Sequence, residues 1–203
     1  MLKLFTAPGT CALASHITLE EAGAQFELAR LDFGRDDQRK PEYLAVNPKG
    51  RVPALVTERG VLTETPAILA YLAQTFPHAQ LAPLADPWAF ARLQSINSYL
   101  CSTVHVSHAH RSRGKRWVDD DASIEAMKKK VAQNMRDCFA LIEQDMLQGP
   151  WMMGADYSVC DPYLFTTARW LEGDGVDIAC FPKVAAHFKQ MQARPAVQRA
   201  LAA

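Results

Sequence analysis

Cys11 is the residue best placed to do chemistry, because it follows the turn Pro8-Gly9 at the junction of a strand-like segment and a helical pattern. The first N–H groups of a helix lack intrahelical partners, and together with the helix dipole they favour a thiolate over a thiol. Redox proteins of the Cys-x-x-Cys type carry a second cysteine three residues later, where this chain has Ala14. A partner thiol must therefore come from solution. The alternative is that Cys11 is only a small packed side chain, the commoner role of a cysteine.

Two further segments can bind a peptide-like ligand. Val52-Pro53 opens a strand-like run after the turn-rich stretch 47–51. A cis bond there would direct the N–H and C=O of Val52 toward a ligand in β fashion, although proline alone predicts a trans bond. Glu64 and Thr65 start the next helical pattern, where free N–H groups and the Thr hydroxyl suit a carboxylate. N-capping by Thr65 explains the same residues, and both roles can hold at once.

A third group comprises Cys101, His105 and His108, which fall at helical spacing i, i+4 and i+7 and can share one face. Such a face can bind zinc, but no fourth ligand is evident in the sequence. We favour the interpretation that His105 acts alone, as a hydrogen-bond donor pointing into a cleft between two domains.

The first part of the chain alternates strand-like and helical segments, which predicts a sheet layered with helices. Segments 2–5 and 26–31 have the pattern of strands, and the helix between them ends near Gly23, so a β-α-β unit is expected. Segments 52–56 and 61–62 predict a hairpin, and Thr65-Pro66 predicts the start of the next helix with Thr65 as its N-cap.

The second part of the chain is predicted to be entirely helical. Three prolines within 77–87 indicate a linker, which divides the chain into domains 1–78 and 87–203. Two long helices are expected to pack side by side, one carrying Leu93 and Leu100 and the other Val131 and Cys138. Segment 158–161 has the form of a capping box that opens a helix through Trp170, and a last helix follows Pro182.

Composition excludes several classes of protein. Lysine plus arginine and aspartate plus glutamate both number 22 in 203 residues, so there is no general attraction to nucleic acid or anionic lipid. No apolar run is long enough to cross a bilayer, and Pro8 and Gly9 interrupt any signal-peptide core, so we expect a cytoplasmic protein. The five cysteines are scattered and odd in number, which predicts reduced thiols.

Several motifs together resemble the beta-class glutathione transferases of bacteria in order and spacing, over essentially the whole chain. They are Lys3-Leu-Phe-Thr-Ala-Pro-Gly-Thr-Cys-Ala-Leu-Ala-Ser-His-Ile17, Asn47-Pro-Lys-Gly-Arg-Val-Pro-Ala-Leu55, Leu62-Thr-Glu64, Asp161-Pro-Tyr-Leu-Phe165 and Arg194-Pro-Ala-Val197. The resemblance implies a thioredoxin-like N-terminal α/β domain, an all-α C-terminal domain and a homodimer. It implies glutathione as co-substrate, with no metal, and conjugation of glutathione to small electrophiles in detoxification.

The resemblance also assigns roles to particular residues. Cys11 and His105 match the residues that reach the glutathione sulfur, and His105 is expected to lower the pKa of that thiol. Val52 with a cis Pro53 matches the backbone clamp on the cysteinyl part. The expected glutathione site also includes Glu64 and Thr65 at the γ-glutamyl end, and Arg35, Arg51 and Ser98.

Some positions depart from the family pattern. Thr6 stands where close relatives have a tyrosine, Ala12 where serine is frequent, Thr65 where serine or glycine is common, and Val106 where relatives often have lysine. Thr6 cannot supply a phenol to activate the thiol, and Val106 cannot supply a charge near the glutathione carboxylates.

Three alternatives to a conjugating enzyme stay open. Cys11 favours a thiol–disulfide reductase or peroxidase that acts through a mixed disulfide with glutathione. A noncatalytic ligand-binding protein on the same scaffold is the second, because one fold hosts many functions. The third is an interaction protein that senses redox state through oxidation of Cys11.

Overall fold

The computed structural model describes residues 1–203, which pack into two compact units. The first unit comprises Met1–Ala91 together with Gln192–Ala203, and the second comprises Arg92–Met191. The domain ranges expected from the sequence, 1–78 and 87–203, stay a prediction, because packing does not tell which segments fold on their own.

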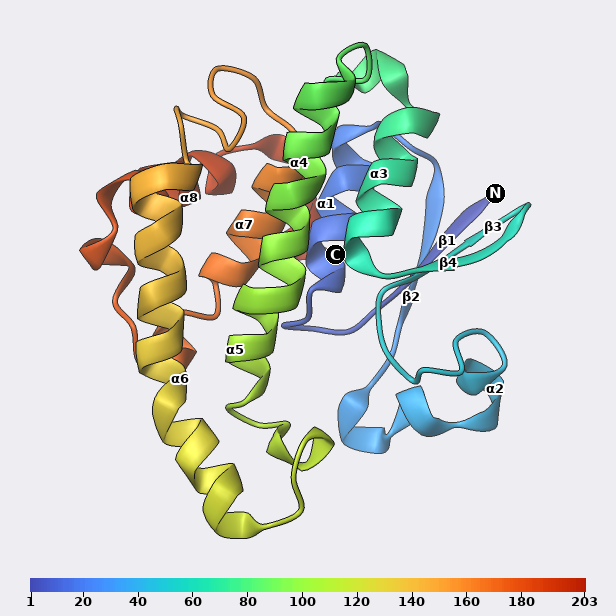
Figure 1. Ribbon diagram of the computed structural model, residues 1–203. Helices are drawn as coiled ribbons and strands as arrows, with labels where there is room; N and C mark the ends of the chain where they lie inside the picture. Colours follow the sequence, from blue (N-terminus) through green and yellow to red (C-terminus); the bar gives the residue numbers. More distant parts are fainter. The chain divides into compact units, whose positions relative to one another are not determined.

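The first unit is built on a four-stranded sheet in the order β2-β1-β3-β4. β1 (Leu2–Thr6) pairs parallel with β2 (Phe26–Arg30) and antiparallel with β3 (Ala54–Thr57), and β3 pairs antiparallel with β4 (Gly60–Thr63). The predicted β-α-β unit and the predicted hairpin are both confirmed, and the first unit has a thioredoxin-like fold (Figure 1).

The helices of this unit are α1 (Ala12–Glu21), α2 (Pro41–Leu44), α3 (Thr65–Thr75) and α9 (Pro195–Ala202), with 3-10 turns at Phe33–Arg35, Asp37–Arg39 and Pro77–Ala79. Side chains alternate across the sheet, as the period of a strand requires. The register pair Leu4 and Leu55 packs in one core cluster with Ile68 and Leu72 of α3. Ala54, the next residue back along β3, packs in a second cluster with Tyr43. Core clusters therefore pack against both faces of the sheet.

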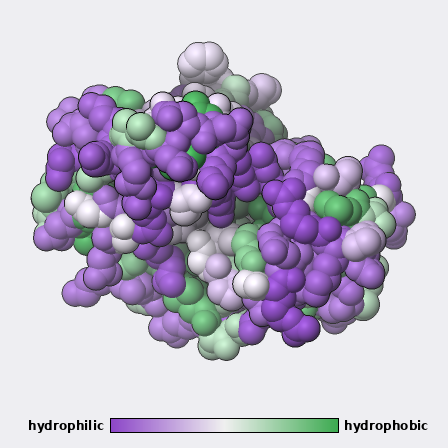
Figure 2. All heavy atoms as spheres, turned by 90° about the horizontal axis from the view of Figure 1, so that it is seen from below, coloured by the Kyte–Doolittle hydropathy of each residue, from purple (hydrophilic) through white to green (hydrophobic).

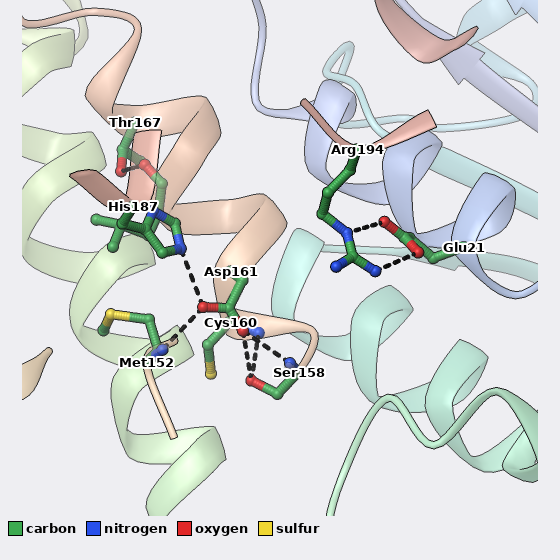
Figure 3. Close-up of polar contacts among 9 residues, drawn as sticks. Glu21, Met152, Ser158, Cys160, Asp161, Thr167, His187 and Arg194 are labelled. Atoms are coloured by element: carbon green, nitrogen blue, oxygen red, sulfur yellow. Dashed lines mark hydrogen bonds and ion pairs between the residues drawn. The ribbon is translucent and has the colours of Figure 1, made fainter. Parts of the chain in front are cut away.

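The C-terminal helix α9 was not expected from the sequence, which predicted that the last helix follows Pro182. Pro195 starts this additional helix, because proline is well suited to a first helical position. Arg194 holds it against α1 through a two-pronged ion pair with Glu21, with Nε–Oε1 at 2.6 Å and Nη2–Oε2 at 2.9 Å (Figure 3). Arg199 Nε makes a second ion pair with Glu20 at 2.6 Å. The first unit therefore includes the end of the chain.

The second unit is entirely helical, as predicted. Its elements are α4 (Pro87–Tyr99, which begins in the first unit), a π-helical turn at Leu100–Val104, α5 (His105–Ala109), α6 (Asp121–Leu141), a π-helical turn at Ile142–Met146, α7 (Cys160–Ala168) and α8 (Pro182–Gln192), with 3-10 turns at Gly114–Arg116, Glu172–Asp174 and Ile178–Cys180. The hydroxyl of Tyr99 donates to the carbonyl of Cys138 at 3.4 Å. The two long helices therefore lie side by side, which confirms the sequence prediction.

The start of α7 has the side-chain hydrogen bonds of the predicted capping box, although the N-cap residue is Val159 and not Ser158. Ser158 Oγ accepts from the Cys160 N–H at 3.3 Å, and Asp161 Oδ2 accepts from the Ser158 N–H at 2.7 Å. The other carboxylate oxygen of Asp161 accepts from the Met152 N–H at 2.8 Å and lies 3.0 Å from His187 Nε2 (Figure 3). This fully buried carboxylate joins α7 and α8 to the preceding loop.

The face drawn in Figure 2 is mostly hydrophilic. None of the helices combines the length and the apolar character that a membrane crossing requires.

Candidate functional site

Cys11 lies at the end of a turn that leads from β1 into α1. Gly9 has a φ of +72°, a conformation that favours glycine, and Thr10 Oγ1 closes the turn on the Ala7 carbonyl at 2.7 Å. Cys11 is the N-cap residue of α1 and is 7% exposed. Its Sγ donates to the carbonyl oxygen of Val52 at 3.6 Å. The sequence prediction of a cysteine at a helix start is confirmed, and the structure brings it to Val52.

Val52 and Pro53 lie just before β3, and the peptide bond between them is cis. The N–H of Val52 makes no hydrogen bond to the rest of the chain. The preceding carbonyl, that of Arg51, is fixed by the Tyr43 hydroxyl and by Asn47 Nδ2, each at 2.6 Å. An extended peptide can therefore pair with the Val52 backbone as an added strand. The sequence analysis did not identify Tyr43, because its hydrogen bond to Arg51 depends on how the loop between the two residues folds back.

The start of α3 differs from the prediction in one respect. Glu64, and not Thr65, is the N-cap residue, and the helix begins at Thr65 itself, with Pro66 in its first turn. Glu64 has a φ of +72°, which is uncommon and strained for a residue with a side chain. No side chain caps this helix, so its first N–H groups stay open to an outside acceptor. Thr65 is 4% exposed.

Lys49 was not among the expected site residues, although it lies in one of the recognised motifs. Its Nζ forms an ion pair with Glu64 and donates to Thr63 Oγ1 at 2.8 Å. The sequence gives no sign of this contact, because Lys49 lies in a turn 15 residues before Glu64. It places a positive charge beside the open start of α3.

The side chains of Arg35 and Arg51 are exposed, and no salt bridge engages either guanidinium. Arg35 lies in the 3-10 turn after β2, and Arg51 lies directly before Val52. Ser98 is exposed on α4, where its carbonyl accepts from Ser102 Oγ at 2.8 Å. Arg51 therefore adjoins the Val52 segment along the chain, and the roles of Arg35, Arg51 and Ser98 in binding all stay predictions.

His105 starts α5, directly after the π-helical turn, and its ring centroid lies 5.0 Å from that of Trp170. The possible zinc face of Cys101, His105 and His108 is not assembled, since no group of three His, Cys, Asp or Glu side chains is placed to hold a metal ion. His108 Nδ1 instead lies 2.7 Å from Asp174 Oδ2. The two histidines therefore differ in their contacts, since His108 pairs with a carboxylate and His105 packs near Trp170.

None of the five cysteines forms a disulfide, as the sequence predicts. Burial raises the pKa of the Cys160 thiol well above its usual range, and the adjacent Asp161 charge raises it further against a hydrogen bond with Ser158. Burial likewise raises the pKa of Tyr99, with Cys138 adding to the shift. Neither group is suited to nucleophilic work near neutral pH.

The sheet order, the cysteine at the start of α1 and the cis-proline segment before β3 define a thioredoxin-like protein with an appended helical unit. A family model described as "Glutathione S-transferase, N-terminal domain" matches residues 1–74. The glutathione S-transferase GstA of Escherichia coli O157:H7 is 35% identical over 205 residues, covering 100% of this chain and 98% of the relative.

Solved structures agree with these matches. A glutathione transferase homolog from Sulfitobacter with bound glutathione has a TM-score of 0.97 and 46% identity, covering 100% of this chain and 97% of that one. A bacterial beta class glutathione S-transferase from Sphingomonas chungbukensis has a TM-score of 0.86 and 34% identity, covering 98% and 97%. This chain belongs to the glutathione S-transferase family.

Proposed function

We infer that this chain is a glutathione transferase, which binds glutathione as co-substrate, activates its thiol and conjugates it to a small electrophile. The observation that carries this function is the pair of open backbone sites in the first unit, the unpaired N–H of Val52 and the uncapped start of α3. Glutathione is a peptide with a free carboxylate at each end, so it suits a strand-like backbone site combined with a helix start. Full-length similarity to a glutathione-bound homolog supports the same function.

In this proposal the Val52 backbone pairs with the cysteinyl part of glutathione. The N–H groups at the start of α3 and the hydroxyl of Thr65 bind the γ-glutamyl carboxylate, and Glu64 binds the adjacent ammonium group. Lys49 forms an ion pair with Glu64 in the structure. The ammonium group of the ligand must therefore share the Glu64 carboxylate with Lys49 or displace Lys49 from it. The expected glutathione site is completed by Arg51, Arg35 and Ser98, at the second carboxylate of glutathione and at the edge of the site.

The sulfur of glutathione would then lie at Cys11, where the helix dipole of α1 favours an anion. His105 is assigned to the same sulfur by the family resemblance alone. Together these groups stabilise the glutathione thiolate, which is the nucleophile in conjugation.

One observation favours a second activity, thiol–disulfide exchange. Cys11 Sγ lies 3.6 Å from the Val52 carbonyl, on the backbone proposed to hold the cysteinyl part of the ligand. A Cys11 thiolate can attack the disulfide of oxidised glutathione, forming a protein–glutathione disulfide and releasing one glutathione thiolate. Disulfides and peroxides are therefore proposed as further substrates.

Assignment to the beta class, a homodimeric assembly and a cytoplasmic location belong to this proposal as well. The balance of 22 basic and 22 acidic residues supports a small-molecule ligand over nucleic acid.

The proposed function is tested by titration calorimetry with glutathione and by turnover of 1-chloro-2,4-dinitrobenzene. Thr65→Val removes one hydroxyl from the start of α3 and is expected to raise the glutathione Kd about tenfold, the cost of a hydrogen bond to a charged group. The matched control is Thr75→Val at the other end of α3, where the hydroxyl bonds only to the Tyr71 carbonyl and the Kd should not change.

Wild-type protein that neither binds glutathione nor conjugates the aryl halide would overturn the proposed function. A Thr65→Val variant that binds as tightly as wild type would overturn only the assignment of the γ-glutamyl site.

A further inference from the structure

The start of α3 carries an ammonium group that belongs to the chain itself. Lys49 Nζ forms an ion pair with the Glu64 carboxylate and donates to Thr63 Oγ1 at 2.8 Å. The side chains of Lys49 and Glu64 are 46% and 57% exposed, so a ligand can reach both charges. A lysine ammonium therefore lies on the same carboxylate to which the proposed function assigns the ammonium group of glutathione.

The contact with Lys49 uses only part of the Glu64 carboxylate. Lys49 bonds to Oε1, and Oε2 makes no hydrogen bond to the chain. A carboxylate has about four lone-pair sites, so a second ammonium group can bind at Oε2 while Lys49 stays in place. The negative charge of Glu64 is thus balanced before any ligand arrives, and it can still accept a ligand that brings an ammonium group.

This balance matters because Glu64 is the N-cap residue of the helix start that is proposed to bind a carboxylate. The first N–H groups of α3 have no side-chain cap, and the hydroxyl of Thr65, a residue that is 4% exposed, makes no hydrogen bond to the chain. These donors favour an anion. An unbalanced Glu64 charge would repel it, and two like charges about 4 Å apart in water weaken binding about fivefold.

We propose that Lys49 takes the place of the ligand ammonium group, so that the chain also binds thiol peptides whose γ-glutamyl end lacks the amino group and carries a carboxylate alone. This inference rests on the proposed function, in which the same helix start binds the γ-glutamyl carboxylate of glutathione. Lys49 is a specificity-determining residue of that site, because its charge decides whether a ligand must bring an ammonium group of its own.

A lysine that only fastened the turn 47–51 to the start of α3 would behave differently. Its loss would weaken both kinds of ligand alike, since both use the same helix start and the same Val52 backbone. Loss of a charge that balances Glu64 harms mainly the ligand without an amino group, because the ammonium group of glutathione can balance Glu64 itself. The ratio of the two dissociation constants therefore separates the two roles.

The test measures two dissociation constants by titration calorimetry, one for glutathione and one for 4-carboxybutanoyl-cysteinylglycine, which is glutathione without its amino group. Wild type should bind this analogue with a Kd within about tenfold of that for glutathione, since the missing contact joins exposed charges. Lys49→Gln should raise the ratio of the analogue Kd to the glutathione Kd about fivefold. Lys49→Arg keeps the charge and should keep the ratio near that of wild type.

Two controls separate this effect from the loss of any surface lysine. Lys3 Nζ forms a similar exposed ion pair with Glu27 Oε1 at 2.7 Å in the same unit, so Lys3→Gln should leave the ratio within about twofold of wild type. In a Glu64→Gln background there is no carboxylate charge to balance. Lys49→Gln should therefore leave the ratio unchanged in that background.

A ratio that does not rise in Lys49→Gln would overturn the inference. So would a ratio that rises as far in Lys49→Arg, in Lys3→Gln or in the Glu64→Gln background. Wild type that binds glutathione but binds the analogue with a Kd more than about tenfold higher also overturns it and leaves the proposed function standing. Wild type that binds neither ligand would overturn both.

Discussion

Cys11 and Cys160 each lie at the start of a helix, but their surroundings differ. Cys11 is the N-cap residue of α1 and is 7% exposed. Its Sγ donates to the Val52 carbonyl, next to the unpaired N–H of the same residue. Cys160 is the first residue of α7, is 0% exposed, donates to the Leu93 carbonyl at 3.4 Å and adjoins the buried carboxylate of Asp161. Burial and that charge raise its pKa well above the usual range.

The comparison teaches that a helix start alone does not make a cysteine reactive. The dipole contributes at both positions, and at Cys160 desolvation and a neighbouring negative charge outweigh it. In the first unit the helix start is proposed to serve a ligand, and in the second unit it serves the fold.

The largest expected difference is in reactivity toward iodoacetamide. Only a thiolate reacts, so Cys160 should stay unmodified in the native protein while Cys11 is alkylated. Peptide mass mapping before and after addition of urea measures both sites, and urea should expose Cys160. Equal labelling of the two cysteines in the native protein would remove the basis of the comparison.

Asp161→Ala should destabilise the second unit strongly. The substitution removes a buried acceptor of the Met152 and Ser158 N–H groups and the partner of His187, so we expect a loss of about 3–5 kcal/mol in unfolding free energy. Urea denaturation followed by circular dichroism gives the value. Asp145→Ala, at an exposed position, is the control and should cost less than about 0.5 kcal/mol. A cost below about 1 kcal/mol for Asp161→Ala would contradict a structural role for the α7 start.

Ser158→Ala tests the other half of the capping box with a smaller effect. It removes the acceptor of the Cys160 N–H, and the loss of a cap of this kind costs about 1 kcal/mol. Because Ser158 and Asp161 bond to each other, the double variant should lose less stability than the sum of the two single variants. Strict additivity in urea denaturation would show that the two residues act separately.

The smallest effect concerns His16 of α1, one helical turn after Cys11. Burial lowers the pKa of His16, an effect that Glu20 opposes and Arg30 reinforces. As pH falls through the ordinary histidine value of 6.5, the unfolded chain takes up a proton that the folded protein does not, so unfolding free energy decreases. This slope is at most about 1.4 kcal/mol per pH unit. His16→Gln should reduce the change in unfolding free energy between pH 7.5 and 5.5. An unchanged pH dependence would contradict the assignment of this effect to His16.

The sequence predicts the first unit well, because apolar residues recur with different periods in its strands and helices and because glycine or proline marks the ends of these elements. Gly9 and Gly23 mark turns that the structure builds with positive φ. Thr65 was wrongly predicted as the N-cap, because its hydroxyl made it the better candidate by residue type. Glu64 occupies that position in a conformation that residue type disfavours. Strain of this kind follows from the surrounding structure and has no local signal.

The parts that could not be predicted depend on long-range contacts. His108 and Asp174 are 66 residues apart, and Lys49 and Glu64 are 15 apart, so neither pair forms a motif. The π-helical turn at Leu100–Val104, which precedes His105, also has no marker in the sequence. Cys11 was predictable as a candidate because its position depends only on the turn before it.

The most direct test of a glutathione sulfur site at Cys11 is mass spectrometry of the native protein after incubation with oxidised glutathione. A Cys180→Ala background removes an exposed cysteine that could react without a site. We predict one glutathione adduct, mapped to Cys11, which persists in Cys160→Ala and is absent in Cys11→Ala. An adduct that survives the Cys11→Ala substitution, or that maps to Cys160, would contradict the account.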